Sequence, residues 1–427
     1  MRILEYPTSA EIQEAIRRPE LSQQNLQEIV KSVFDDVQSE DDDALFRYTA
    51  KFDKVELESL EVTQAEFEEA ALLLSEELKR AITQASKNIS VFHANQFEEA
   101  KVVETMPGVR CWRKSVPIER VGLYIPGGTA PLFSTVLMLG IPASIAGCKE
   151  ITLCSPAGKD GKIHPAILFA ARSVGVTRVL KLGGIQAVAA MTLGTKSINS
   201  SYKIFGPGNQ YVTSAKKYAQ QLGVAIDMPA GPSEVMVVAD ECANANFVAA
   251  DLLSQAEHGA DSQVVLLSTS KEKVAEVQQA LHVQLQQLSR NELAVKALEN
   301  SSAIVVQKQE LLSIINQYAP EHLILQTEFN SDLLPGIVNA GSVFIGPYTP
   351  ESAGDYASGT NHTLPTNGYA RMYSGVSLDS FIKKITFQEI SPEGIQNIGR
   401  TIELMAESEG LDAHKNAVSV RLKELSK

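Results

Sequence analysis

The sequence predicts an α/β protein with two successive parallel, doubly wound sheets. Its 427 residues are enough for two or three globular units. Short apolar runs that end in Gly, Pro or Ser alternate with helical segments from about residue 119 onward. Because strands that alternate with helices pair in parallel through right-handed crossovers, this texture indicates βαβ units. The first series of expected strands is VGLYIPGG, ITLCSPAG, VLKLGG, YKIFGPGN and VAIDMPAGPS, and the second is EVMVVAD, SQVVLLSTS, SAIVVQ, HLILQT and SVFIGP.

The flanking segments have a different texture. Up to about residue 105 the chain is rich in Glu, Lys, Gln and Ala with apolar residues at helical spacing, which predicts mostly helices. Residues 348–375 form a polar stretch of Gly, Ser and Thr that predicts a long functional loop. The last fifty residues are charged and again predicted to be helical.

Residues 121–148 contain no charged side chain over a length that could span a bilayer. Pro126, Pro131, Pro142 and the pair Gly127 and Gly128 are expected to break this stretch into a strand, a turn and a helix of a soluble domain.

Charge and cysteine content exclude several classes. The formal net charge of −13, from 38 basic and 51 acidic side chains, disfavours nucleic acid and membrane surfaces as partners. The four cysteines form no CxxC pair, which excludes a zinc ribbon and indicates a reducing compartment. The start, MRILEYPTSAEIQ, lacks the features of a signal peptide, so a cytoplasmic location is expected.

Three glycine-rich turns follow expected strands: residues 124–128, 183–186 and 206–209. Each leads into a helix whose free N–H groups can face an anion. None is a complete dinucleotide fingerprint, because Tyr211 occupies the third glycine position after Gly206 and Gly208. A single turn of this kind is compatible with plain turn chemistry, whereas three on one domain favour a nucleotide.

Histidine is used only seven times, yet several histidines lie close to acids or in loops. Gln255 and His258 are three apart, so they are expected to share one face near the end of a helix. Such groups suit a divalent metal or proton transfer. Ordinary surface histidines stay open as the alternative, because the spacing along the chain cannot assemble one site. The other pairs are Glu321 with His322, Asp355 with His362, and Glu409 with His414.

Seven segments, taken in order, carry a resemblance to a known family: GLYIPGG, GPGNQYV, MPAGPSE, LLSQAEHG, PEHL, SAGDYASGTNHTLPT and the late EGLDAH. Together they resemble histidinol dehydrogenase across essentially the whole chain. The resemblance implies a zinc-dependent enzyme of histidine biosynthesis that oxidises L-histidinol through L-histidinaldehyde to L-histidine with NAD.

The resemblance also implies roles for individual residues. The implied catalytic acid–base pair is Glu321 and His322, and the implied cofactor contacts are Tyr124, Gln186 and Asn209. The implied zinc ligands are Gln255, His258, Asp355 and His414. The implied substrate contacts are Ser233, Gln255, His258, His322, Asp355, His362, Glu409 and His414.

By the same resemblance, two incomplete Rossmann-like domains and small terminal tails form an intertwined homodimer, with the C-terminal tail completing the partner's site. The expected division is an N-terminal tail 1–22, a metal and catalytic domain of 23–123 plus 236–376, an NAD domain 124–235 and a helical C-terminal tail 377–427.

Two other functions stay open from the sequence. One is a related zinc and NAD dehydrogenase that acts on another amino alcohol or small polyol, and the other is a non-catalytic nucleotide-binding scaffold. A covalent route through a cysteine has little support, because Cys148 and Cys154 lie beside no His or basic run that would lower a thiol pKa, and Cys111 and Cys242 lie outside the seven matched segments.

Overall fold

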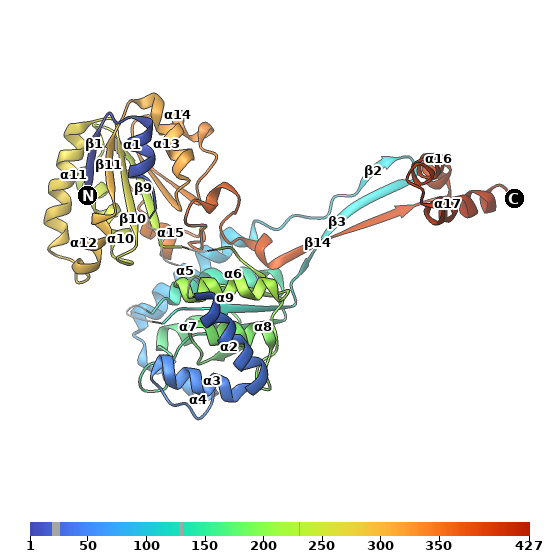
Figure 1. Ribbon diagram of the computed structural model, residues 1–427, viewed down its shortest axis with the longest axis horizontal. Helices are drawn as coiled ribbons and strands as arrows, with labels where there is room; N and C mark the ends of the chain where they lie inside the picture. Colours follow the sequence, from blue (N-terminus) through green and yellow to red (C-terminus); the bar gives the residue numbers. More distant parts are fainter. Residues whose placement is uncertain (19–25, 128–130, 230) are drawn as a thin grey trace.

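The computed structural model describes residues 1–18, 26–127, 131–229 and 231–427. It has two α/β bodies, one above the other, and a long arm that projects sideways and ends at the C-terminus (Figure 1). The expected boundary between residues 22 and 23, and Gly128 of the first glycine-rich turn, lie outside the described residues.

The upper, six-stranded body is built on a fully parallel sheet with the order β1-β11-β10-β9-β12-β13. Alternate side chains of each strand enter different cores, as the period of two requires. Val235 and Val237 face α10, α11 and α12, whereas Met236 and Val238 face α1 and α13. The strands are β1 (Arg2–Glu5), β9 (Glu234–Ala239), β10 (Gln263–Ser268), β11 (Ser302–Val305), β12 (His322–Gln326) and β13 (Ser342–Ile345).

Helices of the six-stranded body are α1 (Ser9–Ala15), α10 (Ala245–Ala256), α11 (Lys271–Leu285), α12 (Asn291–Glu299), α13 (Leu311–Tyr318), α14 (Asn330–Leu333) and α15 (Glu351–Tyr356). Short 3₁₀ turns of this body cover Lys308–Glu310, Leu334–Gly336 and Tyr369–Arg371, whereas a fourth such turn, Leu378–Phe381, packs against the other body.

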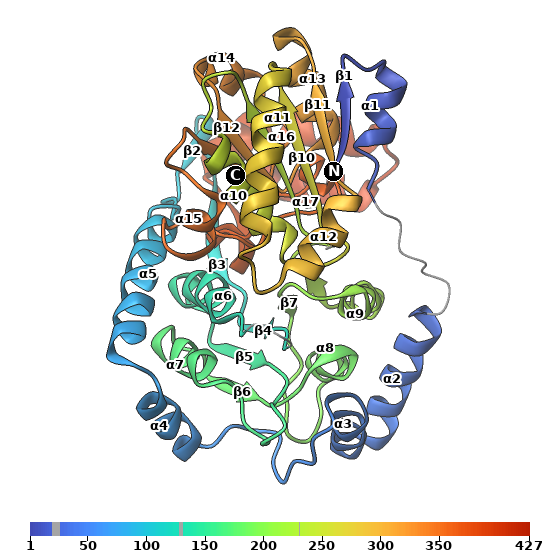
Figure 2. The ribbon, with the colours of Figure 1, turned by 90° about the vertical axis from the view of Figure 1, so that its left-hand side faces the viewer.

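The lower, five-stranded body has a second parallel sheet with the order β6-β5-β4-β7-β8. Helices α5, α6 and α7 cover one face, and α2, α3, α8 and α9 cover the other (Figure 2). Its strands are β4 (Arg120–Tyr124), β5 (Glu150–Cys154), β6 (Arg178–Leu180), β7 (Lys203–Phe205) and β8 (Ala225–Ile226). All ten strands expected from the sequence are therefore confirmed. Apart from the edge strand β1, the two sheets share one order: third, second, first, fourth, fifth.

Helices of the five-stranded body are α2 (Leu26–Glu40), α3 (Asp42–Tyr48), a π-helical turn η1 (Thr49–Asp53), α4 (Gln64–Leu73), α5 (Glu76–Ala94), α6 (Phe133–Ala146), α7 (Pro165–Ser173), α8 (Gly184–Leu193) and α9 (Gln210–Gln221).

The N-terminal helices belong with a different sheet from the one expected. The expected division joined residues 23–123 to 236–376, but α2 packs on α8 and α5 packs on α6, both in the five-stranded body. Buried Phe34 of α2 and Ile89 of α5 lie in its two cores. Amphipathic spacing shows that a helix has an apolar face, but not which sheet covers it. The first residues do not form a separate tail as expected, because β1 pairs with β11 at the edge of the six-stranded sheet.

The arm consists of a three-stranded antiparallel sheet, β14-β3-β2, and two helices packed on each other, α16 (Pro392–Ser408) and α17 (Asp412–Leu425). Its strands are β2 (Val103–Met106), β3 (Val109–Pro117) and β14 (Ile382–Ile390). The expectation of helix throughout the C-terminal tail is therefore wrong for residues 382–390. These residues pair with β3, a partner far away in sequence, and Phe387 stacks on Trp112 with ring centroids 5.5 Å apart.

The uncharged stretch 121–148 forms β4 and then the buried helix α6, as expected. Pro142 differs from expectation, because it lies inside α6 instead of breaking it. In the part of the chain that the structure describes, no helix combines the length and apolar character needed to cross a membrane.

Candidate active site

The expected acid–base pair lies where the amino ends of two neighbouring strands meet. His322 begins β12 and Glu321 directly precedes it, and Glu234 begins the adjacent β9. The backbone N–H of Glu234 donates to Oε2 of Glu321 over 3.0 Å, and Nδ1 of His322 lies 3.3 Å from the carbonyl oxygen of Glu234. This contact leaves Nε2 of His322 as a buried nitrogen without a hydrogen-bond partner. The imidazole is thus held at Nδ1, while its Nε2 makes no hydrogen bond within the protein.

Burial and crowding of carboxylates control the charges at this pair. Burial alone would lower the pKa of His322, but the nearby carboxylates of Glu351, Glu321 and Asp355 raise it to about 10. Burial raises the pKa of Glu321 to about 8.

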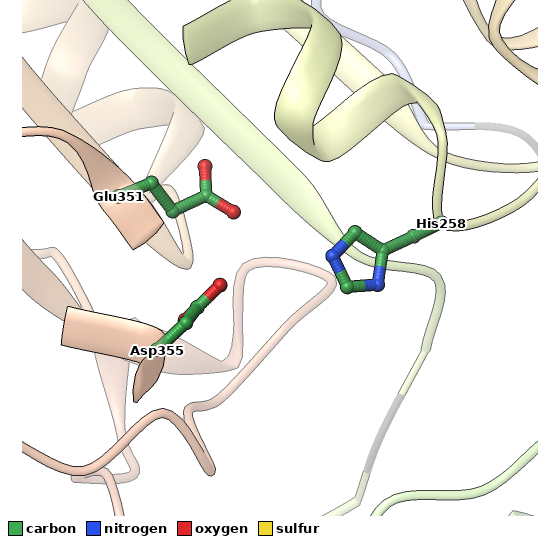
Figure 3. A group of neighbouring side chains, drawn as sticks. All are labelled: His258, Glu351 and Asp355. Atoms are coloured by element: carbon green, nitrogen blue, oxygen red, sulfur yellow. The ribbon is translucent and has the colours of Figure 1, made fainter. Parts of the chain in front are cut away.

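Beside His322 lies a group of side chains that could hold a metal ion. One donor atom each from His258, Glu351 and Asp355 lies within 4.8 Å of the others, and the three side chains point toward a common space (Figure 3). Nε2 of His322 is 3.7 Å from Oδ1 of Asp355, and Nδ1 is 3.9 Å from Oε1 of Glu351. Nitrogen and oxygen donors at this separation suit zinc and other divalent cations.

Glu351 is the member of this group that the sequence reasoning missed. Residues 348–375 were expected to be loop, whereas Glu351 and Asp355 both lie on α15. Four residues apart on a helix, they share one face. The spacing of the two acids in PESAGD is the signal that could have found Glu351.

Gln255 and His258 meet the same group from the end of α10. Gln255 is buried, and in the amide orientation that satisfies both ends its nitrogen donates to Oε1 of Glu351 while its oxygen accepts from the N–H of Glu234 over 2.8 Å. His258 is not on the helix as expected, because α10 ends at Ala256 and Glu257 caps it. His258 therefore projects from the turn that follows, where it is exposed.

His362 and Ser233 lie at the boundary of the two bodies. Nδ1 of His362 is 2.9 Å from the carbonyl oxygen of Asp355, and its Nε2 is 3.1 Å from Oγ1 of Thr135 on α6 of the five-stranded body. Ser233 precedes β9 and lines, together with His258, a cavity of about 1230 Å³ between the bodies. The structure thus brings together seven expected site residues: Ser233, Gln255, His258, Glu321, His322, Asp355 and His362.

Two expected site residues lie elsewhere. Glu409 caps the C-terminal end of α16 and His414 lies in α17, both exposed. Figure 1 shows these two helices at the end of the arm, far from α15, which carries Glu351 and Asp355. A single chain therefore does not bring them to the other site residues.

The three expected cofactor contacts line one cavity of about 1160 Å³ at the carboxyl ends of the five-stranded sheet. The hydroxyl of Tyr124 accepts from the N–H of Gly184 over 3.1 Å, and Oδ1 of Asn209 caps α9 by accepting from two backbone N–H groups. Gln186 is buried and donates from Nε2 to Oδ2 of Asp53 over 3.3 Å. Asn209 lines both this cavity and the one that holds His258 and Ser233.

The cysteines offer no activated thiol to this site. Burial raises the pKa of Cys148 to about 12 and also raises the pKa of Cys154. Cys242 is exposed beside Glu328, which raises the pKa of its thiol, and Cys111 lies on the arm strand β3. A nucleophilic thiolate is disfavoured at all three thiols whose pKa is raised.

Comparison with known proteins agrees with these features. Residues 16–422 match the model of a family described as histidinol dehydrogenase. Proteins named histidinol dehydrogenase from Bacteroides thetaiotaomicron and Mannheimia succiniciproducens are 59% and 52% identical over 100% and 98% of both chains. The crystal structure of histidinol dehydrogenase from Elizabethkingia anophelis superimposes with a TM-score of 0.98 at 57% identity, covering 100% of this chain and 99% of that one. The chain therefore belongs to the histidinol dehydrogenase family.

Proposed function

We propose that this chain oxidises L-histidinol through L-histidinaldehyde to L-histidine, with NAD as hydride acceptor and zinc as the bound metal. One observation carries the proposal. An imidazole with an open nitrogen, His322, lies between a buried carboxyl, Glu321, and the group of potential metal ligands His258, Glu351 and Asp355. The relatives that match the whole chain carry the name of this activity.

The first step needs a base for the alcohol proton. Nε2 of His322 is the open nitrogen, and Nδ1 faces the carbonyl oxygen of Glu234, so the ring is already oriented to accept a proton at Nε2. Neutral imidazole is the form that can do so. Asp355 would also help to hold a bound metal, and its charge would then no longer raise the pKa of His322, which would favour the neutral imidazole.

The second step needs water to add to the aldehyde carbon before a second hydride can leave. Glu321 is the candidate to activate that water, because Oε2 lies 3.6 Å from Nδ1 of His322 at the same strand end. A carboxyl whose pKa is raised to about 8 by burial can take or give a proton near neutral pH. His322 then accepts the proton of the hydrate as it accepted that of the alcohol.

The donors present fit the proposed metal site. His258 and Asp355 supply one nitrogen and one oxygen close together, and Gln255 lies against Glu351 beside them. Zinc, when bound, would supply positive charge and coordination positions for the imidazole and amino nitrogens of the substrate. The same nitrogen and oxygen set also suits manganese or cobalt. We assign Ser233 and His362 to the substrate because both border the cavity or the group in which these ligands lie.

The residues present also fit NAD. Gln186 lines the cofactor cavity, and its buried Oε1 has no hydrogen-bond partner. The order shared by the two sheets is that of a Rossmann sheet without its sixth strand. This supports the proposal of two incomplete Rossmann-like domains, in which residues 124–235 carry the NAD contacts and 236–376 carry the metal and catalytic residues.

We further propose that two copies form an intertwined homodimer and that Glu409 and His414 act in the partner's site. The support is the arm itself. It leaves several apolar side chains exposed on β14, α16 and α17, among them Phe387, Leu404 and Met405. A thin antiparallel ribbon needs further packing to be stable in water, and a second copy would provide it.

Incubation with L-histidinol and NAD tests the proposal and its alternatives together. Two NADH for each histidinol consumed, with loss of turnover after chelation and recovery with zinc, is the expected result. One NADH per substrate indicates a dehydrogenase that stops at a carbonyl. No NADH, together with retained dinucleotide binding, indicates a scaffold.

A further inference from the structure

The cofactor cavity covers only half of the five-stranded sheet. Its walls include Gly127 after β4, residues 155–158 after β5 and residues 184–186 after β6. Asn209, after β7, connects it to the cavity that holds His258. In doubly wound sheets a dinucleotide crosses the point where the strand order reverses, here between β4 and β7. The reacting nicotinamide must lie on the His258 side. The space over β4, β5 and β6 is therefore expected to bind the adenosine half of NAD.

This space contains two hydrogen-bond acceptors side by side. Oε1 of Gln186 is buried and unpartnered, while Nε2 of the same amide donates to the carboxylate of Asp53. Burial raises the pKa of Asp53 to about 6, so the carboxylate is mostly ionised at neutral pH. Because Gln186 already donates to Oδ2 of Asp53, Oδ1 of the half-buried carboxylate is the acceptor left for a ligand that brings an O–H group. A ribose with free 2′- and 3′-hydroxyls brings two.

The local backbone allows the carboxylate to reach this position. Asp53 ends the π-helical turn η1, outside the parallel sheet. A Cβ at Gly183 would lie 3.1 Å from Oδ1 of Asp53 and 2.8 Å from Cβ of Pro156. Glycine at position 183 therefore leaves room for Asp53 beside the turn that carries Gln186.

The usual source of a ribose-binding acid is absent from this sheet. In NAD-binding sheets that acid stands at the end of the second strand. Here β5 is followed by Ser155, Pro156, Ala157 and Gly158, none of which has a carboxylate. Asp160 comes next to line the cavity, but its Oδ1 closes a turn by accepting from the N–H of Lys162 over 3.2 Å.

We propose that Asp53, paired with Gln186, accepts a hydrogen bond from the adenosine 2′-hydroxyl and thereby selects NAD over NADP. The inference rests on the proposed use of NAD. A 2′-phosphate lacks that donor and carries about −1.5 to −2 charges, which a neighbouring carboxylate repels. Asp53, from the N-terminal helical segment, thus binds the adenosine ribose in place of an acid at the end of β5.

Direct binding to the full-length protein tests the inference, by titration calorimetry at neutral pH with NAD, NADP and the 2′-deoxyadenosine analogue of NAD. Wild type should bind NAD about tenfold or more tightly than the analogue, and NADP more weakly still, since one hydrogen bond to a charged acceptor accounts for about ten- to hundredfold in affinity. Equal binding of NAD and the analogue would contradict the proposal without any variant being made.

Variants then assign the effect to one residue. D53N should narrow the NAD-to-NADP ratio by about tenfold or more and reduce the penalty for the analogue, because a neutral amide oxygen accepts a weaker hydrogen bond than a carboxylate. D160N removes one charge from the same cavity while keeping an oxygen at the same atom, and it should leave both ratios unchanged. A shift in D160N with none in D53N would identify Asp160 as the selecting acid and overturn the proposal.

The outcomes separate this inference from the function on which it rests. Failure of wild type to bind either dinucleotide would contradict the proposed NAD dependence itself. Binding of NAD with unchanged discrimination in D53N, in protein whose thermal unfolding matches wild type, would contradict only the role of Asp53. Because Asp53 is half-buried and Asn has nearly its shape, D53N is expected to fold.

Discussion

Nε2 of His322 lies 3.7 Å from Oδ1 of Asp355, so the nitrogen that would take the substrate proton adjoins a candidate metal ligand. The two residues come from a strand start and from helix α15 of the same body. A substrate held by a metal at Asp355 and His258 would therefore present its reacting carbon to His322. The simplest role for a metal in this arrangement is to position the substrate, and activation of the alcohol is secondary.

Replacing His258 should separate metal binding from cofactor binding. We expect H258N to lose zinc and productive substrate binding while NAD affinity stays within about twofold of wild type, because Tyr124 and Gln186 line a different cavity. Elemental analysis and NAD titration measure the two effects. The matched control is H282N, at an exposed position on α11. Full zinc content in H258N would be inconsistent with the assignment.

Replacing all four cysteines by Ala should leave most of the turnover per folded molecule. The reason is that the thiols of Cys148 and Cys154 are buried with raised pKa values, and the other two lie outside the site. The check is a separate rate for L-histidinol and for L-histidinaldehyde. Selective loss of aldehyde oxidation would restore the covalent thiol route.

The buried ion pair of Arg18 and Glu234 predicts a stability effect. The guanidinium donates to both oxygens of Glu234, over 2.5 and 2.7 Å, and its Cζ lies 4.2 Å from the ring centre of Tyr318. R18M leaves the Glu234 carboxylate buried without its partner, so we expect a loss of about 3 kcal/mol in the free energy of unfolding.

Chemical denaturation of wild type and R18M measures this loss. The control is K31M, which breaks the exposed pair of Lys31 and Asp35 and should cost less than about 1 kcal/mol. Equal losses in the free energy of unfolding of R18M and K31M would contradict the prediction that the buried pair stabilises the fold more than the exposed pair does.

A shared site can be tested by mixing inactive variants. H258N and H414N should each be inactive, since each removes one proposed ligand from every site. Co-expressed in equal amounts, they should recover about a quarter of wild-type turnover, because half of random dimers are mixed and each mixed dimer has one intact site. A mixture as inactive as its parents would contradict the sharing of sites between protomers.

Local patterns in the sequence were sufficient for the strands but not for their context. The ten parallel strands followed from apolar runs such as EVMVVA, since strands buried on both faces need them. The arm strand β14 was missed because Ile382 and Ile385 lie at helical spacing among charged residues, and its strand form depends on pairing with β3. The N-terminal helices were assigned to the other sheet for a similar reason, because the apolar periodicity of a helix does not show which sheet it packs against.

The candidate site shows the same limit. The turns at Tyr124, Gln186 and Asn209 could be selected on physical grounds, because they follow strands of a parallel sheet. His322 could not be selected in this way, because it lies at the amino end of its strand and the rule applies only to the carboxyl ends. Glu351 required the helix α15 to be known, and the placement of His414 required the arm.

The central claim is that His322 accepts the proton in both oxidations, whereas Glu321 is needed only to activate water for hydration of the aldehyde. Comparing E321Q with H322N on both half-reactions tests this claim most directly. Rates of NADH formation are measured from L-histidinol and from L-histidinaldehyde. We expect H322N to lose about a hundredfold or more in both, and E321Q to lose about a hundredfold from the aldehyde but less than tenfold from the alcohol. Equal impairment of the two half-reactions in both variants would contradict the division of roles.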